Sequence, residues 1–212
     1  MRIAGTVLVA LTLLAGSARA ASFVFDFDGV TSGSPANGAV GGAPLRFDLA
    51  SFLPELDEFG DPIPGSEAYR PDPEPFDLVR VSDPSARGYG AAPSGLNALD
   101  ALDQGVLITF DAPVTLADFA ATLDQSAFGF PGVFDVVFQD ANGAVLYSLP
   151  TQQSVPSFAA VFTGTLYGVS SIYLPGGAFY DDLGLETVPE PDSLLILAFA
   201  LAALATARRR SY

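Results

Sequence analysis

The sequence contains no cysteine, no histidine and no lysine among its 212 residues. Without histidine and cysteine, the chain has no Ser-His-Asp triad, no Cys-His pair and no zinc site with His or Cys ligands. The absence of lysine excludes a Ser-Lys pair, and no P-loop sequence occurs. Since no disulfide can form, stability must come from the core, with a bound metal as the remaining aid.

Positive charge is scarce between residues 21 and 187, where four arginines face 22 aspartates and glutamates. The resulting net charge of about −18 repels phosphate backbones, which excludes nucleic acid as a partner. The same charge attracts divalent cations and basic partners, and it resists self-association. The length of this region is sufficient for one domain with its own core.

Residues 1–20 have the three parts of a secretory signal peptide. Arg2 supplies a positive start, and residues 3–15 form an apolar run. Ala18 and Ala20 give the small-x-small pattern that signal peptidase accepts, which predicts cleavage after Ala20. An uncleaved membrane anchor or a core helix is the alternative.

The C-terminal tail, residues 188–212, contains a second apolar run. Residues 194–207 carry no charge, and as a helix they rise about 21 Å, which is short of the ~30 Å hydrocarbon core. Flanking polar and arginine side chains reach the two interfaces, so we expect a transmembrane helix over 193–207. A buried core helix is the alternative, although the run lacks the polar face that such a helix keeps.

The two ends predict the same topology. A cleaved signal peptide places residues 21–187 outside the membrane, and a stop-transfer run then leaves the basic cluster on the cytoplasmic side. That cluster consists of Arg208, Arg209 and Arg210.

The tail joins a Pro-Glu-Pro turn, a short apolar helix and an arginine cluster in a fixed order. It resembles the PEP-CTERM sorting signal of Gram-negative bacteria, and the motif residues are Val188, Pro189, Glu190 and Pro191. This resemblance implies processing at the motif by an exosortase, a membrane transpeptidase-like enzyme. The protein would be anchored transiently in the inner membrane and then released to, or attached at, the cell surface. Proteins with this signal typically accompany exopolysaccharide production.

Apolar and polar residues alternate with a period of two in residues 23–28, 45–49, 79–81, 106–110 and 134–138. Residues 140–143 and the stretch 145–149 complete a predicted hairpin, and residues 169–185 predict a second one around 175–177. Each strand has one apolar face, so we expect two sheets that bury these faces against each other. The predicted fold is all-β: a two-sheet, jelly-roll-like β-sandwich ectodomain over 21–187.

Three stretches fit this pattern less well. Residues 54–75 are rich in proline, glycine and acid, which predicts a long exposed loop. Residues 85–104 are rich in small residues, and 98–102 fits one short helical turn. Residues 114–123 fit either a helix or a strand.

The closing stretches Phe162-x-Gly164, Val169-x-x-Ile172 and 179–183 are similar to those of many PEP-CTERM ectodomains and of galactose-binding-type carbohydrate-binding jelly rolls. In such modules a structural calcium often lies between the first and last strands. The resemblance therefore points to Asp26 or Asp28 with Asp181 or Asp182 as calcium ligands. Solvated charges at strand ends are the alternative. Asp181 and Asp182 should face opposite sides of their strand.

The sequence favours an exported, non-enzymatic surface or matrix protein, which is itself the substrate of signal peptidase and of an exosortase. The first alternative is a carbohydrate-binding module, with Tyr69, Tyr89 and Phe130 as candidate sugar platforms. The second is an extracellular glycan hydrolase with two catalytic carboxylates. Because the region contains 22 acidic residues, the sequence does not single out one such pair.

Overall fold

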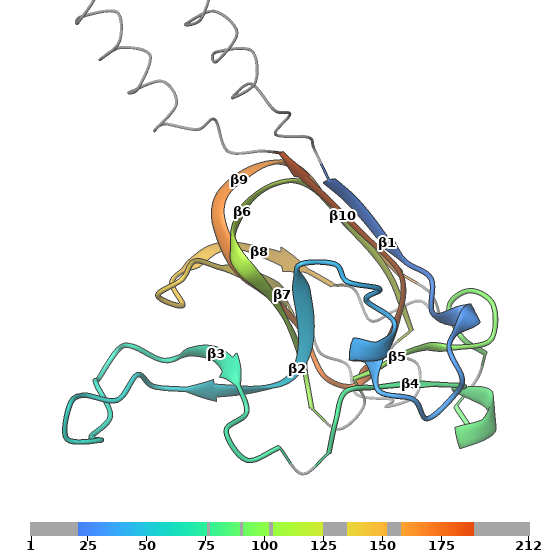
Figure 1. Ribbon diagram of the computed structural model, residues 1–212, viewed down its shortest axis with the longest axis horizontal. Helices are drawn as coiled ribbons and strands as arrows, with labels where there is room; N and C mark the ends of the chain where they lie inside the picture. Colours follow the sequence, from blue (N-terminus) through green and yellow to red (C-terminus); the bar gives the residue numbers. More distant parts are fainter. Residues whose placement is uncertain are drawn as a thin grey trace, which may run out of the picture. The chain divides into compact units, whose positions relative to one another are not determined.

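The computed structural model describes residues 21–75, 77–89, 91–101, 104–124, 135–151 and 158–188 (Figure 1). These residues form β-strands and three single turns of 3-10 helix, so the all-β prediction is confirmed. The turns are η1 (Phe27–Gly29), η2 (Ala36–Gly38) and η3 (Ser85–Arg87). The strands are β1 (Ala21–Phe25), β2 (Leu45–Leu53), β3 (Ala68–Pro71), β4 (Arg80–Ser82), β5 (Ala98–Ala101), β6 (Val106–Asp124), β7 (Asp135–Gln139), β8 (Val145–Pro150), β9 (Phe158–Leu174) and β10 (Ala178–Val188).

Hydrogen bonds join these described strands into one ten-stranded sheet. Its main path runs β4-β5-β10-β6-β9-β7-β8, with β1 on β10, and with β2 between β3 and β6. The pairing therefore does not by itself divide the strands into the two sheets of the expected sandwich.

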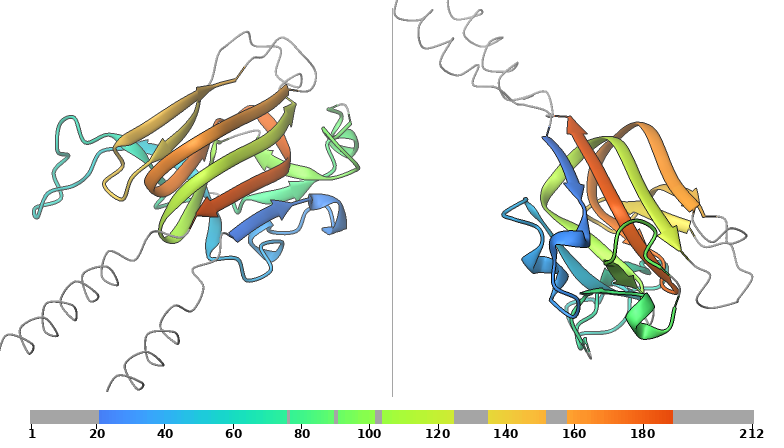
Figure 2. Two further views of the ribbon diagram at one scale, coloured as in Figure 1. Left: turned by 90° about the horizontal axis from the view of Figure 1, so that it is seen from above. Right: turned by 90° about the vertical axis from the view of Figure 1, so that its right-hand side faces the viewer.

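The two longest strands, β6 and β9, pair along their length and curve together (Figures 1 and 2). Their register shifts between Thr109 and Asp118, and such bulges increase the bend and twist of paired strands. The curvature lets side chains from both halves of β6, Ile108 and Phe119, join one buried cluster.

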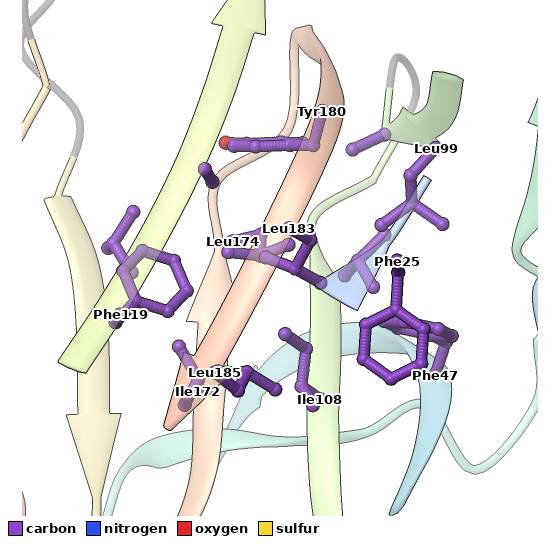
Figure 3. Packing of buried hydrophobic residues seen from close by; sticks show 14 of the residues in the cluster. Phe25, Phe47, Leu99, Ile108, Phe119, Ile172, Leu174, Tyr180, Leu183 and Leu185 are labelled. Carbon is purple, nitrogen blue, oxygen red and sulfur yellow. The ribbon is translucent and has the colours of Figure 1, made fainter. Parts of the chain in front are cut away.

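This core contains the apolar faces of β1, β2, β5, β6, β9 and β10 (Figure 3). Phe47, Ile108, Phe119, Ile172 and Tyr180 are almost completely buried. Burial of each such large side chain contributes roughly 1.5–3 kcal/mol, so the cluster stabilises a chain that has no disulfide.

The first predicted hairpin is confirmed. β7 pairs with β8, and the Asp140 side chain accepts hydrogen bonds from the amides of Asn142 and Ala144 in the turn. Gly143 adopts φ +82°, and a side chain there would collide with Ala68. The turn therefore requires glycine for its backbone angle and for its close approach to β3.

The second predicted hairpin is wrong. β9 and β10 follow each other around residues 175–177, but β6 lies between them in the sheet. The turn at 175–177 is hydrogen-bonded to the end of β5, because the Gly177 amide donates to the carbonyl of Ala101. Local turn chemistry marks where the chain reverses, whereas the pairing partner is chosen by burial on both sides of β6.

The structure also tests three predictions of local secondary structure. The predicted helical turn at 98–102 is wrong, because Ala98–Ala101 is strand β5, held between β4 and β10. Residues 54–75 are not all loop, since they include β3, which pairs with β2. Residues 114–123 are strand, as part of β6.

Candidate functional site

The domain's last strand leads directly into the predicted sorting motif. β10 ends at Val188, which is 41% exposed, while its neighbour Thr187 is buried. Of the predicted processing residues, only Val188 lies within the described residues. Those outside them are Ala18, Ala20, Pro189, Glu190, Pro191, Arg208, Arg209 and Arg210, together with the expected membrane helix 193–207. In the described residues, no helix is long and apolar enough to cross a membrane.

The first and last strands of the domain pair with each other. The beginning of β1 lies beside the end of β10, so the two strands run in opposite directions (Figures 1 and 2). β1 begins at Ala21, the residue that follows the predicted signal-peptide cleavage point. Both predicted processing points therefore adjoin the same end of one strand pair.

Two of the four predicted calcium ligands hold the same loop, residues 94–97. The Asp28 carboxylate accepts hydrogen bonds from the amides of Leu96 and Asn97, at 2.6 and 3.1 Å. The Asp181 carboxylate accepts from the Ser94 amide at 3.1 Å and from the Ser94 hydroxyl at 2.7 Å. Asp28 of η1 and Asp181 of β10 thus bind the same third segment.

The environments of these two carboxylates shift their pKa values in opposite directions. The amides of Leu96 and Asn97 lower the pKa of the exposed Asp28 by stabilising its charged form. Burial raises the pKa of Asp181, and the bonds from Ser94 and from the Asp182 amide only partly offset that effect. The loop is therefore held by one carboxylate whose charged form is stabilised by its surroundings and by one whose charged form is destabilised by burial.

Gly95 lies between these two anchors and has no room for a side chain. Its φ is +53°, and a Cβ atom there would fall within the carboxylate of Asp28. The Asp28 side chain cannot move away without losing its bonds to Leu96 and Asn97. Glycine at this position is therefore required both by conformation and by contact.

The other two predicted ligands serve local roles. The Asp26 side chain accepts from the Asp28 amide and caps η1. Asp181 is buried and Asp182 is exposed, and Asp182 adopts φ +48°. No group of three or more acidic side chains in the described residues could hold a metal ion. Calcium thus remains a prediction. Oδ1 of Asp28 and both carboxylate oxygens of Asp181 accept hydrogen bonds from N–H or O–H donors.

The two described sugar-platform candidates are engaged in packing. The ring of Tyr69 stacks on Tyr173 with centroids 3.5 Å apart, and Phe52 packs against it at 5.1 Å. Tyr89 contacts Phe179, and the Arg87 guanidinium lies over its ring. Phe130 lies outside the described residues. The sequence signal missed this stacking, because Tyr69 and Tyr173 are far apart in the chain.

A small cleft of about 190 Å³ lies beside β2. Three carboxylates line it, and each binds a neighbour: Asp48 pairs with Arg46, Asp72 accepts from Gln104, and Asp77 pairs with Arg80. The backbone amide of Glu74 lowers the pKa of Asp72, and Arg80 lowers the pKa of Asp77. Other residues lining the cleft are Pro35, Asn37, Phe47, Leu49, Pro71, Pro75, Leu78 and Val79.

Comparison with known protein families matches residues 187–210 to the PEP-CTERM protein-sorting motif. The match begins within β10 and ends at the last residue of the arginine cluster. It confirms the sorting part of the predicted resemblance, and it indicates an exported protein that associates with the membrane and is processed by an exosortase-type enzyme. No curated protein matches the chain. The similarity to carbohydrate-binding jelly rolls remains a prediction.

Proposed function

We propose that the chain is a non-enzymatic protein of the cell surface or extracellular matrix, delivered by signal peptidase and an exosortase and associated with exopolysaccharide. The observation that carries the proposal is the sorting-motif match over 187–210, which begins inside the domain's last strand. We further propose that the curved sheet of the domain forms a jelly-roll-like β-sandwich.

A non-enzymatic role is supported by the state of the acids in the cleft. Glycoside hydrolysis needs one carboxylic acid that stays protonated and one carboxylate that stays ionised. The pKa values of Asp72 and Asp77 are both lowered, so neither is suited to donate the proton. These two carboxylates of the cleft therefore do not match the pair that hydrolysis needs, and the rings of Tyr69 and Tyr89 are already in contact with other aromatic rings.

The test is the intact mass of the protein from its native host, with and without the host's exosortase. We expect the mature protein to begin at Ala21 and to end within the Pro-Glu-Pro motif only when the exosortase is present. The variant Glu190→Ala should retain the tail. Glu186→Ala is the matched control, because Glu186 is an exposed residue of β10 just before the motif, and it should be processed normally.

A tail retained in the exosortase-positive host would contradict the sorting proposal. Equal loss of processing in both glutamate variants would show that general acidity near the cleavage point matters rather than the motif.

A further inference from the structure

Exposed apolar side chains are concentrated on residues 52–67, which comprise the end of β2 and the loop that leads to β3. We call this segment the acidic arm. It carries four of the large hydrophobic side chains that are exposed in the described chain: Phe52, Leu56, Phe59 and Ile63. Phe59 is 82% exposed, more than any other large hydrophobic residue described. The concentration of four exposed large apolar side chains on one short segment makes this segment a candidate site of interaction.

The tip of the acidic arm has a defined conformation. The Asp57 side chain accepts hydrogen bonds from the amides of Phe59 and Asp61, both at 2.9 Å. The Gly60 amide donates to the carbonyl of Asp57, and the Ile63 amide donates to the carbonyl of Glu55. Phe59 is therefore presented by an ordered turn, which reduces the entropy that a binding partner must offset.

The base of the arm is fixed to the domain. Tyr69 on β3 stacks on Tyr173 of β9, and Ala68 lies against Gly143 in the β7–β8 turn. Beyond this base the arm extends away from β6, β9 and β10 (Figures 1 and 2). The exposed apolar side chains near its tip consequently lie where a large partner can reach them.

The arm's charge is one-sided. Its acids are Glu55, Asp57, Glu58, Asp61 and Glu67, and the sequence from 52 to 67 contains no basic residue. The nearest described cation, Arg70, lies 3.9 Å from Glu55. A partner that buries Phe59 must therefore supply its own positive charge around the apolar contact.

A second copy of this chain does not fit that requirement. The domain has no lysine, and each of its four arginines is already paired with an acid: Arg46, Arg70, Arg80 and Arg87. Anionic lipid surfaces and acidic polysaccharides would be repelled by the arm.

We infer that the acidic arm is a docking element for a protein partner that offers an apolar pocket rimmed by lysine and arginine. Phe59 and Leu56 are its apolar contacts, and the surrounding carboxylates steer the approach and set the orientation. This inference does not depend on sorting, because the arm's contacts are complete without the tail.

The test uses a labelled 18-residue helical peptide of leucine and lysine, with one apolar face flanked by lysines, as a defined basic and apolar probe. Its binding to the protein purified from the host is measured by fluorescence anisotropy. We expect Phe59→Ser to weaken binding about tenfold or more, the loss typical of a central contact. Added salt should weaken binding further. A peptide of the same composition without an apolar face should bind about tenfold more weakly.

Tyr167→Ser is the matched control, because Tyr167 is an aromatic residue of β9, outside the arm, and is 69% exposed. It should leave peptide affinity unchanged, and both variants should keep the wild-type melting temperature. The inference is overturned if the wild-type protein does not bind the apolar-faced peptide, or if both serine variants lose affinity equally. It is also overturned if Phe59→Ser abolishes self-association in sedimentation, binding to phosphatidylglycerol vesicles or binding to alginate instead.

Discussion

At the residue scale, two carboxylates show how position decides the role of one side-chain type. Asp28 is exposed and receives two amide hydrogen bonds, whereas Asp181 is buried and bonds to Ser94. Their opposite pKa shifts follow from these surroundings rather than from the sequence. Both residues hold the same 94–97 loop, so their replacement should reveal opposite dependence on pH.

The predicted pH dependence has a definite sign. The lowered pKa of Asp28 gives stability that is present above its unfolded value of 3.8 and is lost as pH falls below it. The raised pKa of Asp181 gives stability that is full below 3.8 and is lost as pH rises through its folded value. We would measure the free energy of unfolding in urea from about pH 3 to 7. The loss caused by Asp28→Asn should grow as pH rises, and the loss caused by Asp181→Asn should shrink.

Parallel pH profiles for the two asparagine variants would contradict this assignment. The informative quantity is how the loss in free energy of unfolding changes with pH. The size of the loss at one pH is less informative, because either substitution also perturbs hydrogen bonds to the loop.

Gly95→Ala should destabilise the fold more than a glycine replacement that meets only an unfavourable backbone angle. The new Cβ would collide with Asp28 in addition to facing φ +53°. We expect a loss of about 2 kcal/mol or more, measured by urea unfolding. Gly42→Ala is the control, because Gly42 has φ +85° in open space, and it should cost only about 1 kcal/mol. If both variants lost the same free energy of unfolding, the Asp28 side chain would have moved aside to accommodate the new methyl group.

At the scale of elements, the acidic arm is positioned by pairs that lie far apart in the chain. Gly105 precedes β6, and a side chain there would enter the ring of Tyr173. Tyr173 in turn stacks on Tyr69 at the base of the arm. A substitution at Gly105 should therefore affect the acidic arm, although Gly105 lies almost 40 positions after the arm in the sequence.

We expect Gly105→Ala to displace Tyr173 and loosen the arm, at a cost of about 2 kcal/mol for overpacking. Limited proteolysis should then cut residues 52–67 faster than in the wild-type protein. Gly38→Ala is the control, because no atom lies near a Cβ at Gly38 and its φ is not positive, so its cleavage rate should be unchanged. An unchanged rate for Gly105→Ala would show that the stack does not hold the arm.

At the scale of the whole molecule, the domain combines a large excess of acid with a core that has no covalent cross-link. Residues 21–187 contain four arginines and 22 acids, so most surface charges repel one another. In each of the four ion pairs at least one side chain is more than 40% exposed, so each pair contributes little. Repulsion should therefore outweigh attraction in the response of the fold to salt.

We expect the melting temperature at pH 7 to rise when sodium chloride is increased from about 10 mM to 200 mM, because salt shortens the range of like-charge repulsion. Calorimetry provides the measurement. A fall in melting temperature over this range would show that the ion pairs contribute more than the repulsion costs.

Patterns that depend on neighbouring residues were predictable from the sequence. The period-two alternation predicted most of the strands, and the turn residues predicted the β7–β8 hairpin. The sequence of motif, apolar run and arginines in residues 188–210 predicted the sorting signal that the family comparison supports. These features follow from side-chain direction, backbone angle and hydrophobicity, which a short stretch of chain determines by itself.

Only the tertiary structure decided which distant segments meet. It placed β6 between β9 and β10, paired β1 with β10, and turned Ala98–Ala101 into a strand held from both sides. It also used Tyr69 for packing and brought Asp28 and Asp181 to one loop. The physical reason is that pairing partners are chosen by the joint burial of many side chains, and no single stretch contains that information.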